Sequence, residues 1–242
     1  MICYDAVAFT SPGDHSINED AVEIIRQNGQ FVAIVADGLG SHGGGNIASS
    51  VSIAAIKSVL PDSNIYSEAT LNQCLDAANI AVLAQQTPGV PMKSTVVMLA
   101  VENRRAAFAH VGDSRGYFFR NGRVTSQTMD HSVSQMAVLR GDITLAQIRF
   151  HKKRNQLLRA LGADVKANGE VTPLYPLQDS DAFLLCTDGF WEYVTELEME
   201  ADLFKSSTAT VWLSYMLARV GARVSEKHDN LSAIAIICGG LA

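Results

Sequence analysis

The sequence is poor in the features that mark disulfide-bonded and nucleic-acid-binding proteins. Its four cysteines (Cys3, Cys74, Cys186 and Cys238) form no CxxC pair, which argues against a zinc ribbon or a dithiol redox site. Cys3, Cys186 and Cys238 lie in apolar runs, so we expect them to be reduced thiols in the core. The net charge of −6 argues against a nucleic-acid partner.

Long hydrophobic runs are also absent, and none approaches the length of a membrane span. The first residues, MICYDAVAF, lack the basic region that opens a secretory signal peptide. We therefore expect a cytoplasmic protein with no membrane partner. Repeats, low-complexity runs and linkers are missing too, so we expect one domain over residues 1–242 and a monomer.

The residues that are present predict a sheet-on-sheet fold. Of the 242 residues, 48% are apolar and 18% are charged, which allows a sizeable core. Asn28-Gly29 and Asn121-Gly122 are typical hairpin turns. Strands are expected at 4–10, 21–26, 31–36, 94–101, 106–111, 116–120, 123–126, 169–175, 182–186 and 231–238, and helices at 47–60, 67–84, 132–139, 196–205 and 208–220. Two strand sets with paired helices fit packed sheets better than alternating βα units.

One stretch, FVAIVADGLGSHGGGN at 31–46, is typical of a functional site. A short apolar strand ends in Asp37-Gly38, and a glycine-rich loop leads into the next helix. The loop contains a literal GxGxxG, the pattern of dinucleotide-binding proteins. We reject that interpretation because Asp37 would repel a pyrophosphate, and because a second helix follows the first, so no βαβ unit closes.

Acidic residues recur at the ends of apolar strands along the chain. They are, in order, Glu19, Asp20, Asp37, Asp113, Asp188 and Asp229. One acid in such a place is usually a turn former or a helix cap. Several that converge in a partly buried site need a cation, and oxygen ligands without His or Cys favour Mg²⁺, Mn²⁺ or Ca²⁺.

A series of short motifs spans residues 18 to 232. They are Asn18-Glu19-Asp20, Ala36-Asp37-Gly38-Leu39-Gly40, Ser94-Thr95, Val111-Gly112-Asp113-Ser114-Arg115, Asp130-His131-Ser132, Ala160-Leu161-Gly162, Cys186-Thr187-Asp188-Gly189 and Asp229-Asn230-Leu231-Ser232. Each alone is weak, but the ordered set is specific. It resembles the metal-dependent serine/threonine protein phosphatases of type 2C, and most of all their compact bacterial members.

This resemblance implies a fold and a function. The fold would be α+β, a four-layer α-β-β-α sandwich of two antiparallel sheets flanked by helix pairs, with a small flap at about 132–162. The function would be hydrolysis of phosphoserine and phosphothreonine in proteins, reversing a serine/threonine kinase. Two Mn²⁺ or Mg²⁺ ions, with a possible third, would activate the attacking water.

The resemblance also implies roles for the acidic residues. Asp37 would bridge two ions, and the carbonyl of Gly38 would contact one of them. Asp188 and Asp229 would hold the first ion. Asp37, Asp188 and Asp229 are therefore the expected catalytic residues.

Further residues would complete the metal site. Glu19 and Asp20 would act near the ions through water, and Asp113 with Asp188 would form the third-metal site. Asn230 would lie beside the ligands and orient them.

Contact with the substrate phosphate is where the sequence departs from the family. Its members usually carry an arginine three residues before the first Asn of the Asn-Glu-Asp motif, and that arginine binds phosphate with two parallel hydrogen bonds. Here the position is His15, with Ser16 beside it, and a histidine offers fewer donors. His42 in the glycine loop could also reach substrate. Alternatively, His15 points to solvent, and Arg115 or a flap lysine binds the phosphate.

Several interpretations remain open at this point. The basic run at 149–154 is either a solvated face or a positive surface that attracts acidic, phosphorylated segments. His110 and His131 are expected to be structural. The alternative function is a catalytically inactive relative that binds phosphoproteins or a kinase. Loss of a metal aspartate would favour that alternative, and none is lost.

Overall fold

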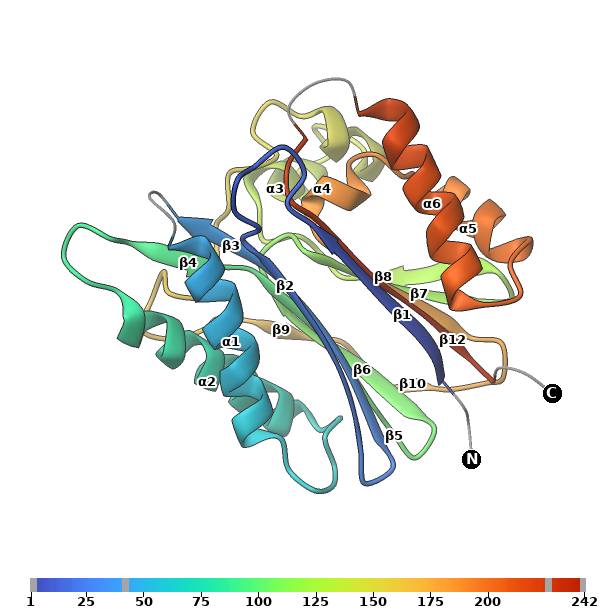
Figure 1. Cartoon of the computed structure of the whole chain (residues 1–242), viewed down its shortest axis with the longest axis horizontal. Helices are drawn as coiled ribbons and strands as arrows, with labels where there is room; N and C mark the ends of the chain where they lie inside the picture. The colour runs from blue at the N-terminus through green and yellow to red at the C-terminus, as the bar shows by residue number, and fades with distance from the viewer. Residues whose placement is uncertain (1–3, 41–43, 225–227, 240–242) are drawn as a thin grey trace.

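The computed structural model describes residues 4–40, 44–224 and 228–239 (Figure 1). Its elements in chain order are β1 (Tyr4–Ser11), β2 (Asp20–Gln27), β3 (Gln30–Gly40), α1 (Gly45–Val59), α2 (Glu68–Gln85), β4 (Met92–Ser94), β5 (Val96–Glu102), β6 (Arg105–Val111), β7 (Arg115–Arg120), β8 (Arg123–Gln127), α3 (Val133–Leu139), the 3₁₀ helix η1 (Leu145–Phe150), β9 (Glu170–Val171), β10 (Tyr175–Pro176), β11 (Ala182–Cys186), α4 (Asp188–Trp191), α5 (Glu196–Phe204), α6 (Ala209–Arg223) and β12 (Leu231–Cys238).

Two antiparallel sheets form the centre of the fold. In the described chain, one sheet has the order β1-β12-β11-β7-β8, and the other has the order β10-β6-β5-β3-β2 with β4 and β9 added at β3 and β6. Strand β3 pairs antiparallel with both β2 and β5, so the GxGxxG does not belong to a βαβ unit. The hairpin turns occur as predicted: Asn28 and Gly29 have φ of 50° and 77°, values that asparagine and glycine tolerate best.

The core lies in three layers between the four layers of secondary structure. Apolar side chains of the two sheets, such as Phe31, Phe108 and Phe183, meet in the middle. The outer face of one sheet packs on α1 and α2, and that of the other packs on α5 and α6 (Figure 1). The predicted α+β sandwich with paired outer helices is confirmed.

One predicted strand was wrong, and one short helix was missed. The strand expected at 169–175 is two short strands, β9 and β10, that pair with different parts of β6. Pro173 lies between them and has no N–H with which to continue a ladder. Helix α4 was not predicted, because four residues are too few to show a helical period.

The cysteines are thiols in the described part of the chain. Cys74, Cys186 and Cys238 are buried and free, as expected for the last two, whereas Cys3 lies outside the described residues. Within those same residues, no helix has the length and apolarity that a membrane crossing requires.

Antiparallel pairing brings the acidic strand ends to one edge of the sandwich. Strands β3 and β6 both pair with β5, so they run in the same direction and end at the same edge. In the β2–β3 ladder Asp20 lies opposite Asp37. Strand β11 ends at Cys186 beside the start of β12, which places Asp188 near Asp229. The fold thus assembles acids that are far apart in the sequence.

Candidate active site

A cavity of about 220 Å³ lies where these strand ends meet. Its lining comes from the loop before β2, from β3, from the ends of β6 and β11, from the start of β12 and from the flap. The lining residues are Glu19, Asp37, Gly38, Leu39, Gly40, Asp113, Asn155, Leu157, Asp188, Asp229 and Asn230. Five of the six predicted acids therefore share one cavity, and Asp20 lies next to it.

The backbone of Asp37 is fixed by the neighbouring strand. Its N–H donates to Oγ1 of Thr95 (3.2 Å), and its carbonyl accepts from the Thr95 N–H (2.8 Å) and from the Ser94 hydroxyl (2.9 Å). Burial, together with the charges of Asp20 and Asp188 among others, raises the pKa of Asp37 well above its ordinary value. The backbone at Asp37 is therefore fixed, and its carboxylate lies where a negative charge is unfavourable without a cation.

Gly38 is required by a close approach of backbone. A side chain there would clash with the carbonyl of Gly45, and its Cβ would lie 2.7 Å from the carbonyl oxygen of Glu19. The Gly38 N–H donates to that Glu19 carbonyl (3.1 Å). The Glu19 carboxylate accepts from the Gly45 N–H at the start of α1 (3.1 Å), a favourable place for a negative charge. The loop before β2 is thereby tied to the Asp37 strand.

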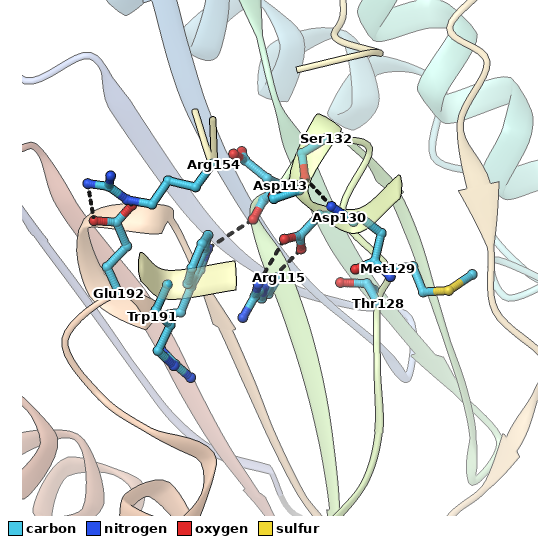
Figure 2. A network of polar contacts seen from close by, with 12 residues as sticks. Asp113, Arg115, Thr128, Met129, Asp130, Ser132, Arg154, Trp191 and Glu192 are labelled. Atoms are coloured by element: carbon cyan, nitrogen blue, oxygen red, sulfur yellow. Dashed lines mark hydrogen bonds and ion pairs between the residues drawn. The ribbon is translucent and has the colours of Figure 1, made fainter. Parts of the chain in front are cut away.

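Asp188 and Asp113 line the cavity from different sheets. Burial, followed by the charges of Glu192, Asp229 and Asp20, raises the pKa of Asp188 to about 7. Burial and the charge of Asp188 raise the pKa of Asp113 well above its usual range. The indole N–H of Trp191 donates to the Asp113 carbonyl (3.0 Å), which joins α4 to the end of β6 (Figure 2).

Asp20 is a buried neighbour of the cavity. Its Oδ2 accepts from the Thr187 hydroxyl (3.0 Å), whereas its Oδ1 is buried with no partner in the described chain. Burial raises the pKa of Asp20 to about 7, although hydrogen bonds from Ser232 and Thr187 oppose this. A water or cation in the cavity would satisfy the orphaned oxygen.

Asn230 orients the loop that carries the remaining candidates. Its Oδ1 accepts from the Glu19 N–H (2.7 Å), and its amide donates to the Pro12 carbonyl (2.9 Å). The Asp14 carboxylate accepts from the His228 N–H (2.7 Å), and the Asp14 N–H donates back to the His228 carbonyl (3.0 Å). These hydrogen bonds hold the loop at 12–17 against residues 228–230.

The position of the loop at 12–17 brings His15 close to a predicted metal ligand, Asp229. Nε2 of His15 lies 3.3 Å from Oδ1 of Asp229, and both side chains are 60% exposed. His15 contacts the rim of the cavity without lining it, and exposed Ser16 is also outside the lining. His42 lies outside the described residues.

Arg115 cannot serve as the phosphate-binding residue, so that part of the alternative is wrong, whereas a flap lysine stays a candidate. Its side chain is 2% exposed and binds Asp130 through two hydrogen bonds of 2.8 Å. Its guanidinium also lies over the Trp191 ring, 3.6 Å from the centroid (Figure 2). All of its donor faces are committed to the interior.

The basic run at 149–154 is neither wholly solvated nor wholly available to substrate. Arg149 is buried and pairs with Glu196 (2.6 Å), and Arg154 pairs with Glu192 beside the cavity (Figure 2). Lys152 and Lys153 are the exposed cations of the run, and Phe150 is exposed as well. Sequence reasoning also missed Asn155, which lines the cavity, because no local pattern marks a loop residue that only the tertiary fold brings to the site.

A second group of ligand-type atoms lies in His110, His131 and Glu170, within 4.8 Å of one another. The two imidazoles are stacked at 4.7 Å and 15°, so their lone pairs run side by side and do not converge on one ion. His131 Nδ1 accepts from the Gly112 N–H (3.1 Å), and Nε2 of His110 lies 2.8 Å from the Met129 carbonyl. Burial lowers the pKa of both histidines, so the stack is neutral and structural, as expected.

The acidic cavity, in contrast, suits a divalent cation. Its donors are oxygens, several carboxyl pKa values in it are raised by burial and mutual repulsion, and Asp20 presents an orphaned oxygen beside it. Cations such as Mg²⁺ and Mn²⁺ prefer oxygen ligands of this kind.

The architecture is thus a four-layer sandwich with an acidic cavity at one end of its two sheets. The family model described as protein phosphatase 2C matches residues 13–228 of the chain. The chain belongs to the protein phosphatase 2C family. This membership confirms the predicted resemblance, fold and enzyme class, and nothing in the site favours the inactive relative.

Individual relatives agree with this assignment. The serine/threonine phosphatase stp of Listeria monocytogenes is 28% identical over 228 residues, which cover 90% of this chain and 89% of the relative. PstP of Mycobacterium tuberculosis is 33% identical over 188 residues, 74% of this chain and 34% of PstP. The crystal structure of the PstP catalytic domain in complex with two manganese ions has a TM-score of 0.80 and 26% identity, over 98% of this chain and 99% of that one.

Proposed function

We propose that this chain hydrolyses phosphoserine and phosphothreonine in proteins with the help of two Mn²⁺ or Mg²⁺ ions and a weaker third. The observation that carries the proposal is the convergence of five carboxylates, from strands of both sheets, around one cavity. The raised pKa values of Asp37, Asp113 and Asp188 show that these three carboxyls are electrostatically unfavourable in the ionised form without a metal. The two manganese ions of the PstP catalytic domain support the same chemistry here.

The cavity residues divide the work of holding the ions. Asp37 would help to hold both ions, the Gly38 carbonyl would contact one of them, and Asp188 and Asp229 would help to hold the first ion. Asp113 would share Asp188 with the third ion. Bound ions would lower the pKa of a water and stabilise the charge that develops on the phosphoryl group.

The remaining residues position the ligands and the substrate. Glu19 and Asp20 would accept hydrogen bonds from water around the ions, and the amide of Asn230 keeps Glu19 in place. His15 lies at the rim, 3.3 Å from Asp229, where its imidazole could donate to a phosphate oxygen of the substrate. Ser16 and His42 remain further candidates for substrate contact.

The setting of this activity is also proposed. A phosphatase of this kind opposes a serine/threonine kinase, which would be its functional counterpart. We infer a monomer that works in the cytoplasm, and the buried free thiols of Cys74, Cys186 and Cys238 are compatible with a reducing compartment.

Release of phosphate from a phosphothreonine peptide tests the proposal. Activity should disappear in EDTA and return when Mn²⁺ is added in excess. Asp37→Asn should lower kcat by roughly 10²-fold or more, since it removes charge from the metal site. Asp142→Asn, at an exposed flap acid outside the cavity, is the matched control and should keep wild-type turnover. Full activity of metal-free protein would overturn the proposal.

A further inference from the structure

A second, larger hollow lies on the flap. We name it the flap groove. Its volume is about 460 Å³, enough for one or two side chains of a bound peptide. Its walls are α3 and the segment that follows η1. The lining residues are Val133, Met136, Ala137, Arg140, His151, Lys153 and Leu158.

The flap groove combines an apolar floor with cations at its edge. Met136 is 38% exposed and Leu158 is 54% exposed, high values for apolar side chains that a partner does not cover. Arg140 and Lys153 are exposed, and within the described chain neither has a carboxylate within ion-pair distance. Arg154, in the same flap, is paired with Glu192.

This charge pattern points to an anionic partner. No acidic residue lines the flap groove, although the whole chain carries a net charge of −6. Unpaired cations around an apolar floor complement a segment that carries carboxylates or phosphates next to an apolar side chain. A second copy of this acidic chain is a poorer match for the same reason.

The flap groove lies next to the candidate active site. Lys153 lines the groove, Arg154 lines a small cavity shared with Asp188, and Asn155 and Leu157 line the acidic cavity. The next residue, Leu158, lines the groove again. One short stretch of chain therefore forms the wall between the two hollows.

That wall is fixed to the body of the protein. The Val133 N–H donates to the Gln156 carbonyl (2.9 Å), and the Leu158 N–H donates to the His131 carbonyl (2.7 Å). The ion pair of Arg154 with Glu192 ties the same stretch to the end of α4 (Figure 2). Groove and cavity are thus preformed at a fixed separation, as two subsites for one extended ligand require.

We propose that the flap groove binds the part of a phosphoprotein substrate that flanks the phosphorylated residue. An apolar side chain of the substrate would lie on Met136 and Leu158, and its acidic groups would meet Arg140 and Lys153. This inference rests on the proposed phosphatase function and adds a substrate class to it, namely sites with an apolar residue among acidic ones.

Phosphothreonine peptides of equal length test the substrate preference. One set carries a leucine and two glutamates on either flank, a second replaces the leucine by serine, and a third replaces the glutamates by lysines. The first set should have a kcat/KM about tenfold above the other two, mostly through KM, and the advantage of the glutamates should shrink in high salt. Equal kcat/KM values for the three sets would overturn the proposal.

Neighbouring lysines provide a matched pair of variants. Lys153→Glu should lower about fivefold the ratio of kcat/KM for the acidic peptide to that for p-nitrophenyl phosphate, which is too small to reach the groove. Lys152→Glu makes the same charge change next to the groove but outside its lining, and should alter the ratio less than about twofold. Equal effects of the two variants would show that only the general charge of the flap matters.

Two further readouts separate the possible failures. Fluorescence polarisation of fluorescein-labelled peptides measures binding without turnover, so the ranking of the peptides can be tested even in the absence of hydrolysis. Peptide binding in the predicted order without hydrolysis would contradict the proposed function but not the groove as a binding site. Sedimentation of wild type and of Met136→Glu tests the groove as a contact between copies. If the wild type is a dimer, and Met136→Glu is a monomer that still binds peptide as the wild type does, the proposal is overturned.

Discussion

Asp188→Asn should stabilise the metal-free protein at neutral pH and abolish most of its stabilisation by Mn²⁺. In the folded protein, burial and the neighbouring acids Glu192, Asp229 and Asp20 raise the pKa of Asp188 from 3.8 to about 7. Each pKa step of one corresponds to about 1.4 kcal/mol, so ionising this group costs about 4 kcal/mol at most. Because the neighbouring carboxyls share protons and water enters the cavity, we expect a measured gain of about 1–2 kcal/mol.

The pH dependence follows from the direction of this shift. A carboxyl with a raised pKa in the folded state holds its proton there, whereas the unfolded chain loses it near pH 3.8. Between about pH 4 and pH 7 the folded state therefore binds more protons, and the free energy of unfolding falls as the pH rises. The stabilisation of the folded state by protonated Asp188 is therefore complete below about pH 4 and is lost above about pH 7.

Thermal unfolding of EDTA-treated wild type and Asp188→Asn checks this reasoning. At pH 8 the variant should melt about 2–8 °C higher, and the two curves should converge near pH 4–5. Excess Mn²⁺ should reverse the order, because only the wild type gains the full ligand set. A metal-free variant that melts at or below wild type at pH 8 would refute the electrostatic account of the cavity.

Three other substitutions probe the third ion, the phosphate contact and the core. Asp113→Ala should lower turnover yet keep two tight Mn²⁺ sites in calorimetry; loss of those sites would contradict its assignment to the third ion. His15→Arg should lower KM for p-nitrophenyl phosphate, because a guanidinium can donate two parallel hydrogen bonds to a phosphate, and equal KM values for wild type, His15→Arg and His15→Ala would show that His15 does not touch phosphate. Arg115→Met should lower the free energy of unfolding in urea by about 3–5 kcal/mol, since it leaves Asp130 buried without its partner. Arg104→Met, which removes an exposed ion pair, should lower it by less than about 1 kcal/mol, and similar losses for the two variants would contradict that reasoning.

The sequence predicted the parts of the site that are tied to strand ends. An acid after an apolar run, next to glycine or asparagine, marks the point where a buried strand reaches the surface. Asp37 and Asp188 were placed in this way, and the packing of the two sheets then brought them to one cavity. The main strands and helices were also recognised, because their apolar periods are long enough to read.

Residues whose role depends on tertiary contacts could not be predicted. Nothing local shows that Arg149 is buried against Glu196 while the nearby Lys153 is exposed. The proximity of His15 and Asp229 likewise results from hydrogen bonds between two segments that are distant in the sequence. Such contacts depend on how distant segments pack in the tertiary fold, and neither the hydrophobic periodicity nor the spacing of motifs gives that information.

Crystals of the protein soaked in Mn²⁺ and recorded at the manganese absorption edge test the central claim most directly. We predict two strong anomalous peaks in the cavity, both in contact with Asp37 and one also with Asp188 and Asp229, and a weaker third peak near Asp113. Peaks only at His110, His131 and Glu170, or none within the acidic cavity, would contradict the claim that the converging carboxylates form the metal centre.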